Sequence, residues 1–270
     1  MKRPQHRKPP VTTGIARKVG LARALSKLGY CSREQATRLI REGNVHLNGI
    51  TPRNPETPVR LGIDHIEIQG RAVKAAKKIY LMMNKPRSVV TSAADEKGRD
   101  TVYSLLPANL SWLAPVGRLD KASEGLLLFT NDSEWGARIS DPATHLDKTY
   151  HVQIRSHAEP QLLETLERGV ETERGEVLRC KSARVLRSGE KSSWLAIVLD
   201  EGKNRHIRRM LDGRGVEVLR LIRVAVGPLP LGDLPKGEHR ALTPGELESL
   251  NRVMRERRAS GPDGLPDPKR

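Results

Sequence analysis

The first part of the chain carries apolar residues at helical spacing. Leucines three and four residues apart predict a helix over 21–28, ended by the glycine that follows. Ser32, with Gln35 three residues later, forms a capping-box pattern and predicts a second helix that Gly43 ends. The strand-like segments that follow are Val45–Leu47 and His65–Ile68. Two helices and a small sheet therefore predict a small α+β module over 19–72.

A different pattern begins near residue 80 and continues to about residue 250. Short runs rich in apolar and β-branched residues alternate with turn residues, which predicts strands. These runs are Tyr80–Met83, Ser88–Thr91, Gly125–Asn131, Thr149–Arg155, Trp194–Leu199 and Val216–Val224. Helices are expected from Pro160 to Gly169, over about 203–212, and after Thr243, a good N-cap. The mixture predicts an α+β domain with a mostly antiparallel sheet and flanking helices.

The remaining segments are basic and show no apolar periodicity. No acidic residue precedes Glu34, and three prolines interrupt the first eighteen residues, which favours a disordered arm. The last twenty residues are rich first in arginine and then in glycine, proline and aspartate. The expected organisation is an arm (1–18), the small module (19–72), a linker (73–79), a large domain (80–250) and a flexible basic tail (251–270).

Charge is the strongest compositional signal. The chain has 48 Lys and Arg against 32 Asp and Glu, a formal net charge of +16. A chain this basic is attracted to polyanions, and the attraction is independent of sequence and weakened by salt. Nucleic acid is the expected partner, although charge alone suits a ribosomal protein, an RNA chaperone or an RNA enzyme equally well.

Several classes of protein are disfavoured by what the sequence lacks. No apolar run approaches the roughly 20 residues needed to cross a bilayer, so no membrane association is expected. The basic N-terminus is not followed by an apolar stretch, which argues against a secretory signal. Cys31 and Cys180 form neither a disulfide framework nor a zinc spacing. We expect a cytoplasmic protein without a bound metal, and the missing glycine-rich fingerprints argue against a nucleotide cofactor.

The block Gly117–Asp132 is the first candidate for chemistry. An apolar strand follows a tight polar segment in which Asp120 stands between Arg118 and Lys121. A nearby cation favours the ionised carboxylate that a nucleophile or a base requires. The residues alone fit a loop salt bridge as well as a catalytic aspartate.

Two later stretches hold further candidates. Tyr150 lies in an alternating strand and is one of only four tyrosines, so it is either a core residue or an aromatic platform for an unstacked base. In Glu201–Met210, helical spacing puts Arg205, Arg208 and Arg209 on one face of a helix. That face is either simply solvated or contacts RNA.

The stretch that begins Leu21-Ala-Arg-Ala-Leu-Ser-Lys-Leu-Gly-Tyr and continues to Gly49 resembles an S4 RNA-binding domain. The resemblance covers about fifty residues. It implies two helices packed on a small sheet, with RNA held by the basic helix surface. By this resemblance the expected RNA contacts are Arg33, Arg38 and Arg41.

Residues 117–132 resemble the signature of the small-subunit-type branch of pseudouridine synthases, the RsuA/RluB/RluE/RluF-type ribosomal RNA enzymes. The matching pattern is Gly-Arg-Leu-Asp, then a hydroxyl residue, Gly-Leu, an apolar run and Thr-Asn-Asp. Ser123 stands where threonine is more frequent. Lys148-Thr149-Tyr150 and Glu201-Gly-Lys-Asn-Arg-His-Ile-Arg-Arg-Met210 resemble two further motifs of the family, with His206 in place of the usual glutamine.

The family resemblance implies roles for individual residues. Asp120 would be the catalytic aspartate, Arg208 its ion-pair partner, Tyr150 the residue that packs against the target base, and Arg118 a supporting cation. Additional RNA contacts are expected at Lys148, Arg205, Arg209 and Arg223.

The function implied is the isomerisation of uridine to pseudouridine in ribosomal RNA, free or in a pre-ribosomal particle, by a monomer that uses no cofactor. The main alternative is a non-catalytic S4-type RNA-binding factor in ribosome assembly. An S4-linked methyltransferase would need a methyl donor, and the glycine-rich loop for it is missing. A glycosidase would need a second positioned carboxylate, for which Glu124 is the nearby candidate.

Removal of residues 1–72 is predicted to weaken RNA affinity more than it alters the chemical step, because the basic helices of the small module lie within the deleted part. Binding and single-turnover rates at saturating RNA, measured on the truncated and full-length chains, test this. Unchanged affinity after truncation would refute the binding role of the module.

Overall fold

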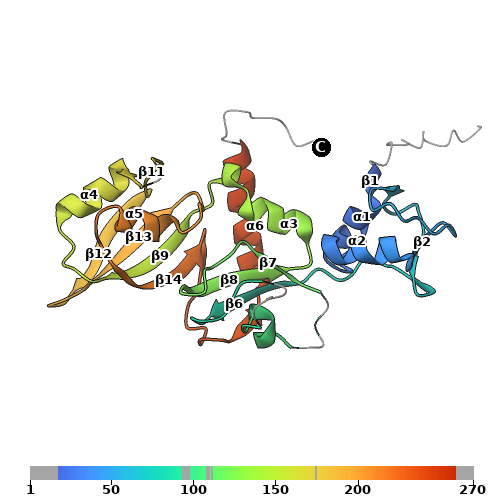
Figure 1. Cartoon of the computed structure of the whole chain (residues 1–270), viewed down its shortest axis with the longest axis horizontal. Coiled ribbons are helices and arrows are strands. Elements are labelled where there is room, and N and C mark those ends of the chain that lie inside the picture. The colour runs from blue at the N-terminus through green and yellow to red at the C-terminus, as the bar shows by residue number, and fades with distance from the viewer. Residues whose placement is uncertain (1–17, 93–97, 108–109, 111, 174, 260–270) are drawn as a thin grey trace, which may run out of the picture. The chain divides into compact units, whose positions relative to one another are not determined.

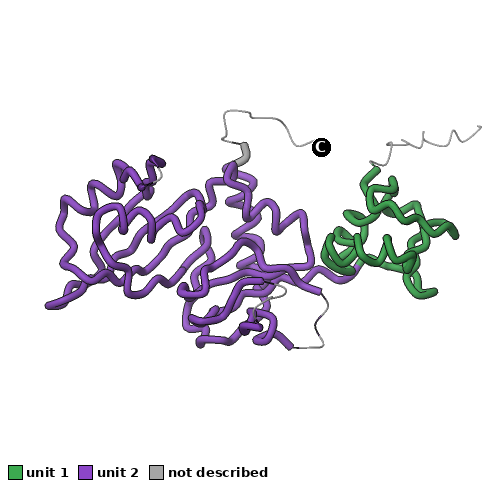
Figure 2. Tube along the Cα trace, viewed as in Figure 1, with its two compact units in different colours: residues 1–75 green, residues 76–270 purple. Residues whose placement is uncertain are grey.

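The chain forms two compact units, residues 1–75 and 76–270, which are coloured separately in Figure 2. The computed structural model describes residues 18–92, 98–107, 110, 112–173 and 175–259. The expected arm, apart from Lys18, and the end of the expected tail lie outside these residues. Each unit is described by itself below.

The first unit is a pair of helices on two small sheets. Its elements are β1 (Lys18–Gly20), α1 (Leu21–Lys27), α2 (Arg33–Glu42), β2 (Val45–Leu47), β3 (Pro58–Arg60), β4 (Ile66–Ile68) and β5 (Arg71–Ala72). β1 pairs with β3, and β2, β4 and β5 form the second sheet. The capping box at the start of α2 is present, because Ser32 and Gln35 each bond the backbone N–H of the other. Lys18 of β1 pairs with Arg60 of β3, so the ordered fold includes one residue before the expected start of the module at residue 19.

The second unit is built on a nine-stranded sheet (Figure 1). Its strands are β6 (Tyr80–Lys85), β7 (Ala114–Val116), β8 (Glu124–Thr130), β9 (Lys148–Ile154), β12 (Ser182–Ser188), β13 (Ser193–Leu199), β14 (Val218–Val226), β15 (Leu229–Pro230) and β16 (His239–Ala241). The main order is β12-β13-β9-β14-β8-β6-β16. Within the described residues the strands pair antiparallel throughout, except for β8 and β14, which run parallel. The expected α+β class with a mostly antiparallel sheet is confirmed.

Helices and short turns cover the sheet in sections. These elements are η1 (Val102–Leu105), α3 (Ser133–Ser140), η2 (Pro142–Thr144), α4 (Pro160–Arg168), α5 (His206–Asp212) and α6 (Pro244–Ala259), with the small hairpin β10 (Val170–Glu171) and β11 (Val177–Leu178). α4 and α5 bury Leu166, Ile207 and Met210 against β9, β13 and β14. α3 and α6 pack Trp135 and Leu250 against one set of side chains of β6 and β8, and η1 packs against another.

The parallel pair β8–β14 lies at the middle of the sheet and needs a glycine. Gly125 has φ +104°, and a Cβ there would lie 2.3 Å from the carbonyl oxygen of Arg223. No side chain fits in that space, so Gly125 lets the two backbones approach closely enough to join the halves of the sheet.

Two expected boundaries differ from the structure. The helix expected over about 203–212 begins at His206, because Arg205 has a left-handed backbone (φ 50°) and ends the preceding turn. The tail expected from residue 251 is helical as far as Ala259. Met254 is buried and Arg257 bonds Asp147, and these contacts extend α6 beyond the apolar pattern.

Some elements were not anticipated, and one expected strand is absent. α3 and β12 had no expectation at all. Of the segment 88–91, only Val90 makes a bridge, to Thr101. No helix in the described part of the chain is long and apolar enough to cross a membrane. Both cysteines are buried and free.

Gly125→Ala is predicted to lower the free energy of unfolding by roughly 3 kcal/mol or more, since the methyl group would collide with backbone and the φ angle disfavours alanine. Urea unfolding measures the effect. Gly136→Ala is the matched control, because Gly136 lies in α3 and its added Cβ would come no closer than 3.4 Å to a side-chain methyl. The control should be stabilised by about 0.5–1 kcal/mol. Equal effects of the two changes would contradict the assigned role of Gly125.

Candidate active site

A pocket of about 580 Å³ lies within the second unit, among the segment before β8, strands β9 and β14, and the segment 199–207. Its volume is in the range of small-molecule sites. The expected site residues that line it are Arg118, Asp120, Lys148, Tyr150, Arg205 and Arg223. Arg208 and Arg209 are not among the lining residues, and Arg33, Arg38 and Arg41 are exposed on α2 of the other unit. The pocket thus brings together six residues from four separate stretches of sequence.

Asp120 lies in the turn before β8 with its carboxylate about one-third exposed. The cation nearest to it is Arg205, whose Nη1 lies 3.9 Å from Oδ2. Arg205 reaches the carboxylate because its left-handed backbone turns it away from helix α5. An ion pair between partly exposed side chains at this distance contributes little to stability. Its effect is to place the positive charge of Arg205 beside the Asp120 carboxylate.

The expected direct pairing of Arg208 with Asp120 is not what the structure shows. Arg208 donates to the carbonyl oxygens of Ala122 (3.2 Å) and Val218 (3.4 Å), so it ties the turn that carries Asp120 to the start of β14. Burial lowers the pKa of Arg208, and the charge of Asp120 acts in the opposite direction. The charge of Asp120 therefore acts on Arg208, but the hydrogen bond of Arg208 goes to the carbonyl oxygen of Ala122, two residues after Asp120.

A buried lysine fixes the same turn from the other side. Lys85 is fully buried at the end of β6, and its Nζ donates to the carbonyl oxygens of Pro86 (2.9 Å), Ser123 (3.0 Å) and Asp120 (3.3 Å). Burial lowers the pKa of Lys85 to about 8, against the raising effect of Asp120 and Glu124. An ammonium has three N–H donors, so at neutral pH each carbonyl receives one.

Further hydrogen bonds complete the turn. The backbone N–H of Ser123 donates to the Asp120 carbonyl (2.9 Å), and the hydroxyl of Thr91 donates to the Leu119 carbonyl (2.8 Å). Neither Lys85 nor Thr91 was anticipated as a site residue. The available signal for Lys85 was its position two residues after the apolar run Tyr80–Met83, where the strand could continue into the core. A lysine that is buried there needs hydrogen-bond partners.

Glu124, the nearby second carboxylate, is paired with cations of the fold. It is buried and accepts two hydrogen bonds from Arg220 (3.1 Å each) and an ion pair from Lys236 (2.7 Å). Burial alone would raise the pKa of Glu124, but the bonds from Arg220 and Lys236 outweigh it and the pKa is lowered. Glu124 does not line the pocket, so it is not placed to act as the second carboxylate of a glycosidase.

The wall formed by β9 and β14 is cationic and aromatic. Arg223 is buried and its Nε donates to the Leu126 carbonyl (2.7 Å), which holds the guanidinium in the wall. Burial, and then the charge of Arg223, lower the pKa of Lys148. Tyr150 is half-buried between the two core clusters on either side of it. Its ring is held in position and lines the pocket at the same time.

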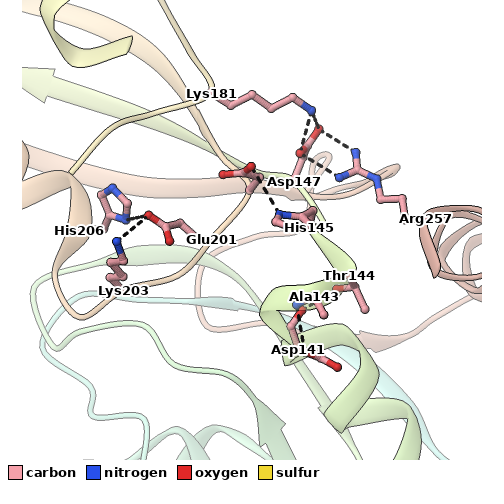
Figure 3. Close-up of polar contacts among 11 residues, drawn as sticks. Asp141, Ala143, Thr144, His145, Asp147, Lys181, Glu201, Lys203, His206 and Arg257 are labelled. Atoms are coloured by element: carbon pink, nitrogen blue, oxygen red, sulfur yellow. Dashed lines mark hydrogen bonds and ion pairs between the residues drawn. The ribbon is translucent and has the colours of Figure 1, made fainter. Parts of the chain in front are cut away.

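The segment 201–209 is held by a chain of ion pairs, of which Figure 3 shows those of Glu201 with Lys203 and His206. Lys203 pairs with Glu201 (3.2 Å) and Glu176 (3.3 Å), and Arg209 also binds Glu176. His206 is buried, bonds the Arg179 carbonyl through Nε2 (3.0 Å), and has Nδ1 3.8 Å from Glu201. Arg209, an expected RNA contact, is thus engaged in an internal pair.

A second cluster in Figure 3 anchors the start of β9. The carboxylate of Asp147 forms ion pairs with Lys181 (2.8 Å) and with Arg257 of α6 (3.2 Å). His145 lies 3.6 Å from Asp200, which connects the segment before β9 with the end of β13. These pairs fix the strand that presents Lys148 and Tyr150.

The arrangement places the partly exposed Asp120 carboxylate, which is paired only weakly with Arg205, beside an aromatic ring and several cations in one pocket. A carboxylate in such a place can act as a nucleophile or a base, and the cations suit the phosphates of a polyanion. No cluster of His, Cys, Asp or Glu that could hold a metal ion occurs among the residues described.

Comparisons with known proteins give matches to both units of the chain. The family model described as RNA pseudouridylate synthase matches residues 79–212, and the S4 domain model matches residues 19–62. Ribosomal large subunit pseudouridine synthase B of Bacillus subtilis (strain 168) is 35% identical over 85% of this chain and 94% of its own. An uncharacterized RNA pseudouridine synthase of Aquifex aeolicus (strain VF5) is 36% identical over 87% and 95%.

A solved structure has a similar fold. The crystal structure of a pseudouridylate synthase superimposes with a TM-score of 0.61 at 28% identity, and covers 86% of this chain and 99% of that one.

Lys85 is predicted to titrate with a pKa of about 8. Between about pH 8 and the ordinary lysine value near 10.5, the unfolded chain keeps a proton that the folded chain has lost. The contribution of Lys85 to the free energy of unfolding therefore increases as the pH rises across this window, and is lost as the pH falls to 8. NMR of the lysine Cε and Nζ signals, assigned with Lys85→Met, measures the pKa. A value near 10.5 would contradict the burial of this ammonium.

Proposed function

This chain belongs to the RNA pseudouridylate synthase family, and we propose that it converts a specific uridine of ribosomal RNA to pseudouridine with Asp120 as the catalytic residue and no cofactor. The observation that carries the proposal is the position of the Asp120 carboxylate, in the pocket and 3.9 Å from Arg205. The ribosomal RNA substrate is supported by the S4 match and by the printed name of the Bacillus subtilis relative.

The reaction is an internal rearrangement. The N1–C1′ bond of uridine breaks, the uracil turns, C5 bonds to C1′, and the proton lost from C5 is balanced by one gained at N1. Reactant and product have the same atoms and oxidation state, so neither an oxidant nor a group donor is consumed. What the protein has to supply is a reactive carboxylate, an enclosed site and a fixed orientation for the base.

Asp120 starts the reaction by one of two routes, attack on the substrate or removal of a ribose proton. Both need a carboxylate held close to the sugar. The proposed positioning comes from Lys85 and Arg208, which bind the carbonyls of Asp120 and Ala122, while Arg205 faces the carboxylate with a positive charge. The support attributed to Arg208 is therefore exerted through the backbone of the turn.

The target uridine has to leave its stack to enter the pocket, at a cost of a few kcal/mol. Tyr150 offers an aromatic face to the base. Lys148 lies two residues before it on β9, and Arg223 is its register partner on β14. Arg118 is exposed at the pocket on the segment before Asp120. These cations are proposed to hold the phosphates on either side of the extruded nucleotide.

The S4 unit is proposed to hold RNA outside the pocket. Arg33, Arg38 and Arg41 are exposed on α2, whose buried face is formed by Ala36 and Ile40. The helix therefore presents charge to solvent while its apolar side supports the fold. A ribosomal RNA substrate, bare or in a pre-ribosomal particle, implies that the protein acts in the cytoplasm, and we propose that it acts as a monomer.

Asp120→Asn is predicted to lower the turnover rate by at least about 10³-fold and to leave RNA affinity nearly unchanged, because the amide keeps the shape of the side chain but is neither a nucleophile nor a base. Tritium release from ribosomal RNA labelled at uridine C5 measures turnover, without any added cofactor.

Asp212→Asn is the matched control, since Asp212 is exposed at the end of α5 and does not line the pocket. It should release tritium at the wild-type rate. Full activity of Asp120→Asn would refute the mechanism. Release by neither protein on unmodified RNA of both subunits and on pre-ribosomal particles, with binding intact, would favour a non-catalytic assembly factor.

A further inference from the structure

Helices α4 and α5 cover one face of strands β12, β13, β9 and β14. Val152, Leu195 and Ile197 point into the core that α4 and α5 cover. Because side chains alternate along a strand, the residues between them, such as Gln153 and Trp194, point to the opposite face. That face lies on the other side of the sheet from the pocket wall formed by Tyr150 and Leu221.

One row of this face crosses all four strands. Arg187 of β12 is paired with Trp194 of β13, Trp194 with Gln153 of β9, and Gln153 with Arg220 of β14. Residues in register across adjacent strands are side-chain neighbours. The row therefore places an arginine at each end and an indole between them.

The indole organises both arginines. The guanidinium carbon of Arg187 lies 5.3 Å from the Trp194 ring centroid, and that of Arg220 lies 5.6 Å from it. Contacts of this kind hold the planar guanidinium in a defined orientation. An arginine that is already oriented loses less conformational entropy when it binds a phosphate.

The face carries more positive than negative charge. Arg184 of β12 is exposed and lies close enough to His151 of β9 that its charge, after burial, lowers the pKa of that imidazole. Arg187 is exposed, and neither it nor Arg184 has an ion-pair partner within 4 Å among the described residues. Glu124 neutralises part of the charge of Arg220, but it is shared with Lys236.

We propose that this surface, formed by Arg184, Arg187, Trp194 and Arg220, binds the sugar-phosphate backbone of the substrate RNA at a place remote from the target uridine. We assign RNA as the ligand because the surface combines oriented guanidinium groups with an aromatic ring. Guanidinium groups of this kind form bidentate hydrogen bonds with phosphates. The inference rests on the proposed function, since a ribosomal RNA is far larger than the pocket and extends past its edges.

The test replaces the two exposed arginines together, as Arg184→Gln/Arg187→Gln, in a full-length chain that also carries Asp120→Asn so that the RNA stays unmodified. Binding to protein-free transcripts of both ribosomal RNAs is measured across a range of salt concentrations. Loss of two phosphate contacts should raise Kd about tenfold and make the slope of log K against log salt shallower by about 1.5. With Asp120 intact, the double variant should need about ten times more RNA to reach half-maximal tritium release.

Arg168→Gln/Arg214→Gln is the charge-matched control, because both residues are exposed, one on α4 and the other after α5. It should keep the wild-type slope. An unchanged slope in the test variant, or an equal loss in the control, would overturn the proposal. A loss seen only on protein-containing particles, and not on bare RNA, would overturn it in favour of a protein partner. Failure of wild-type tritium release would concern the proposed function alone, since binding is measured separately.

Discussion

A buried ammonium has to donate its three hydrogens to acceptors inside the protein, because no water reaches it. Lys85 donates to three carbonyls, and two of them belong to the turn that carries Asp120. The turn contains no helix or strand of its own, so these bonds, with those of Thr91 and Arg208, define its shape. Asp120 is thus held through its backbone, which leaves its carboxylate partly exposed in the pocket.

The close approach of β8 and β14 brings the parts of the pocket together. Gly125 allows Arg223 to lie beside the start of β8, and Arg223 in turn bonds the Leu126 carbonyl. Arg223 of the cationic wall and the Asp120 turn are therefore attached to the same two strands, β14 and β8. Glu124, next to Gly125, is held by Arg220 and Lys236 on the other side of the sheet. One pair of strands consequently carries both the pocket and part of the basic face behind it.

Local signals accounted for much of the fold, and long-range contacts account for what was missed. The capping box of α2 and the alternation in β9 depend on neighbours in sequence, so they could be predicted from it. α3 is short, with only Trp135 and Ile139 buried, and β12 is an edge strand whose side chains are largely exposed. Such elements form because of what they pack or pair with. The same holds for the site, where the family pattern indicated Asp120, but the partner nearest to it depends on the left-handed backbone of Arg205.

The pairing of Gly125 with Arg223 joins residues about a hundred positions apart along the chain. A ribosome releases the Asp120 turn well before it releases Arg205 and Arg223, so a growing chain holds the Asp120 carboxylate long before the surrounding wall exists. Non-local strand pairs form only after the intervening segment is available, and they are slow to close. The pocket can therefore close only late in synthesis, after β14 has emerged, because the wall that β14 contributes does not exist before then.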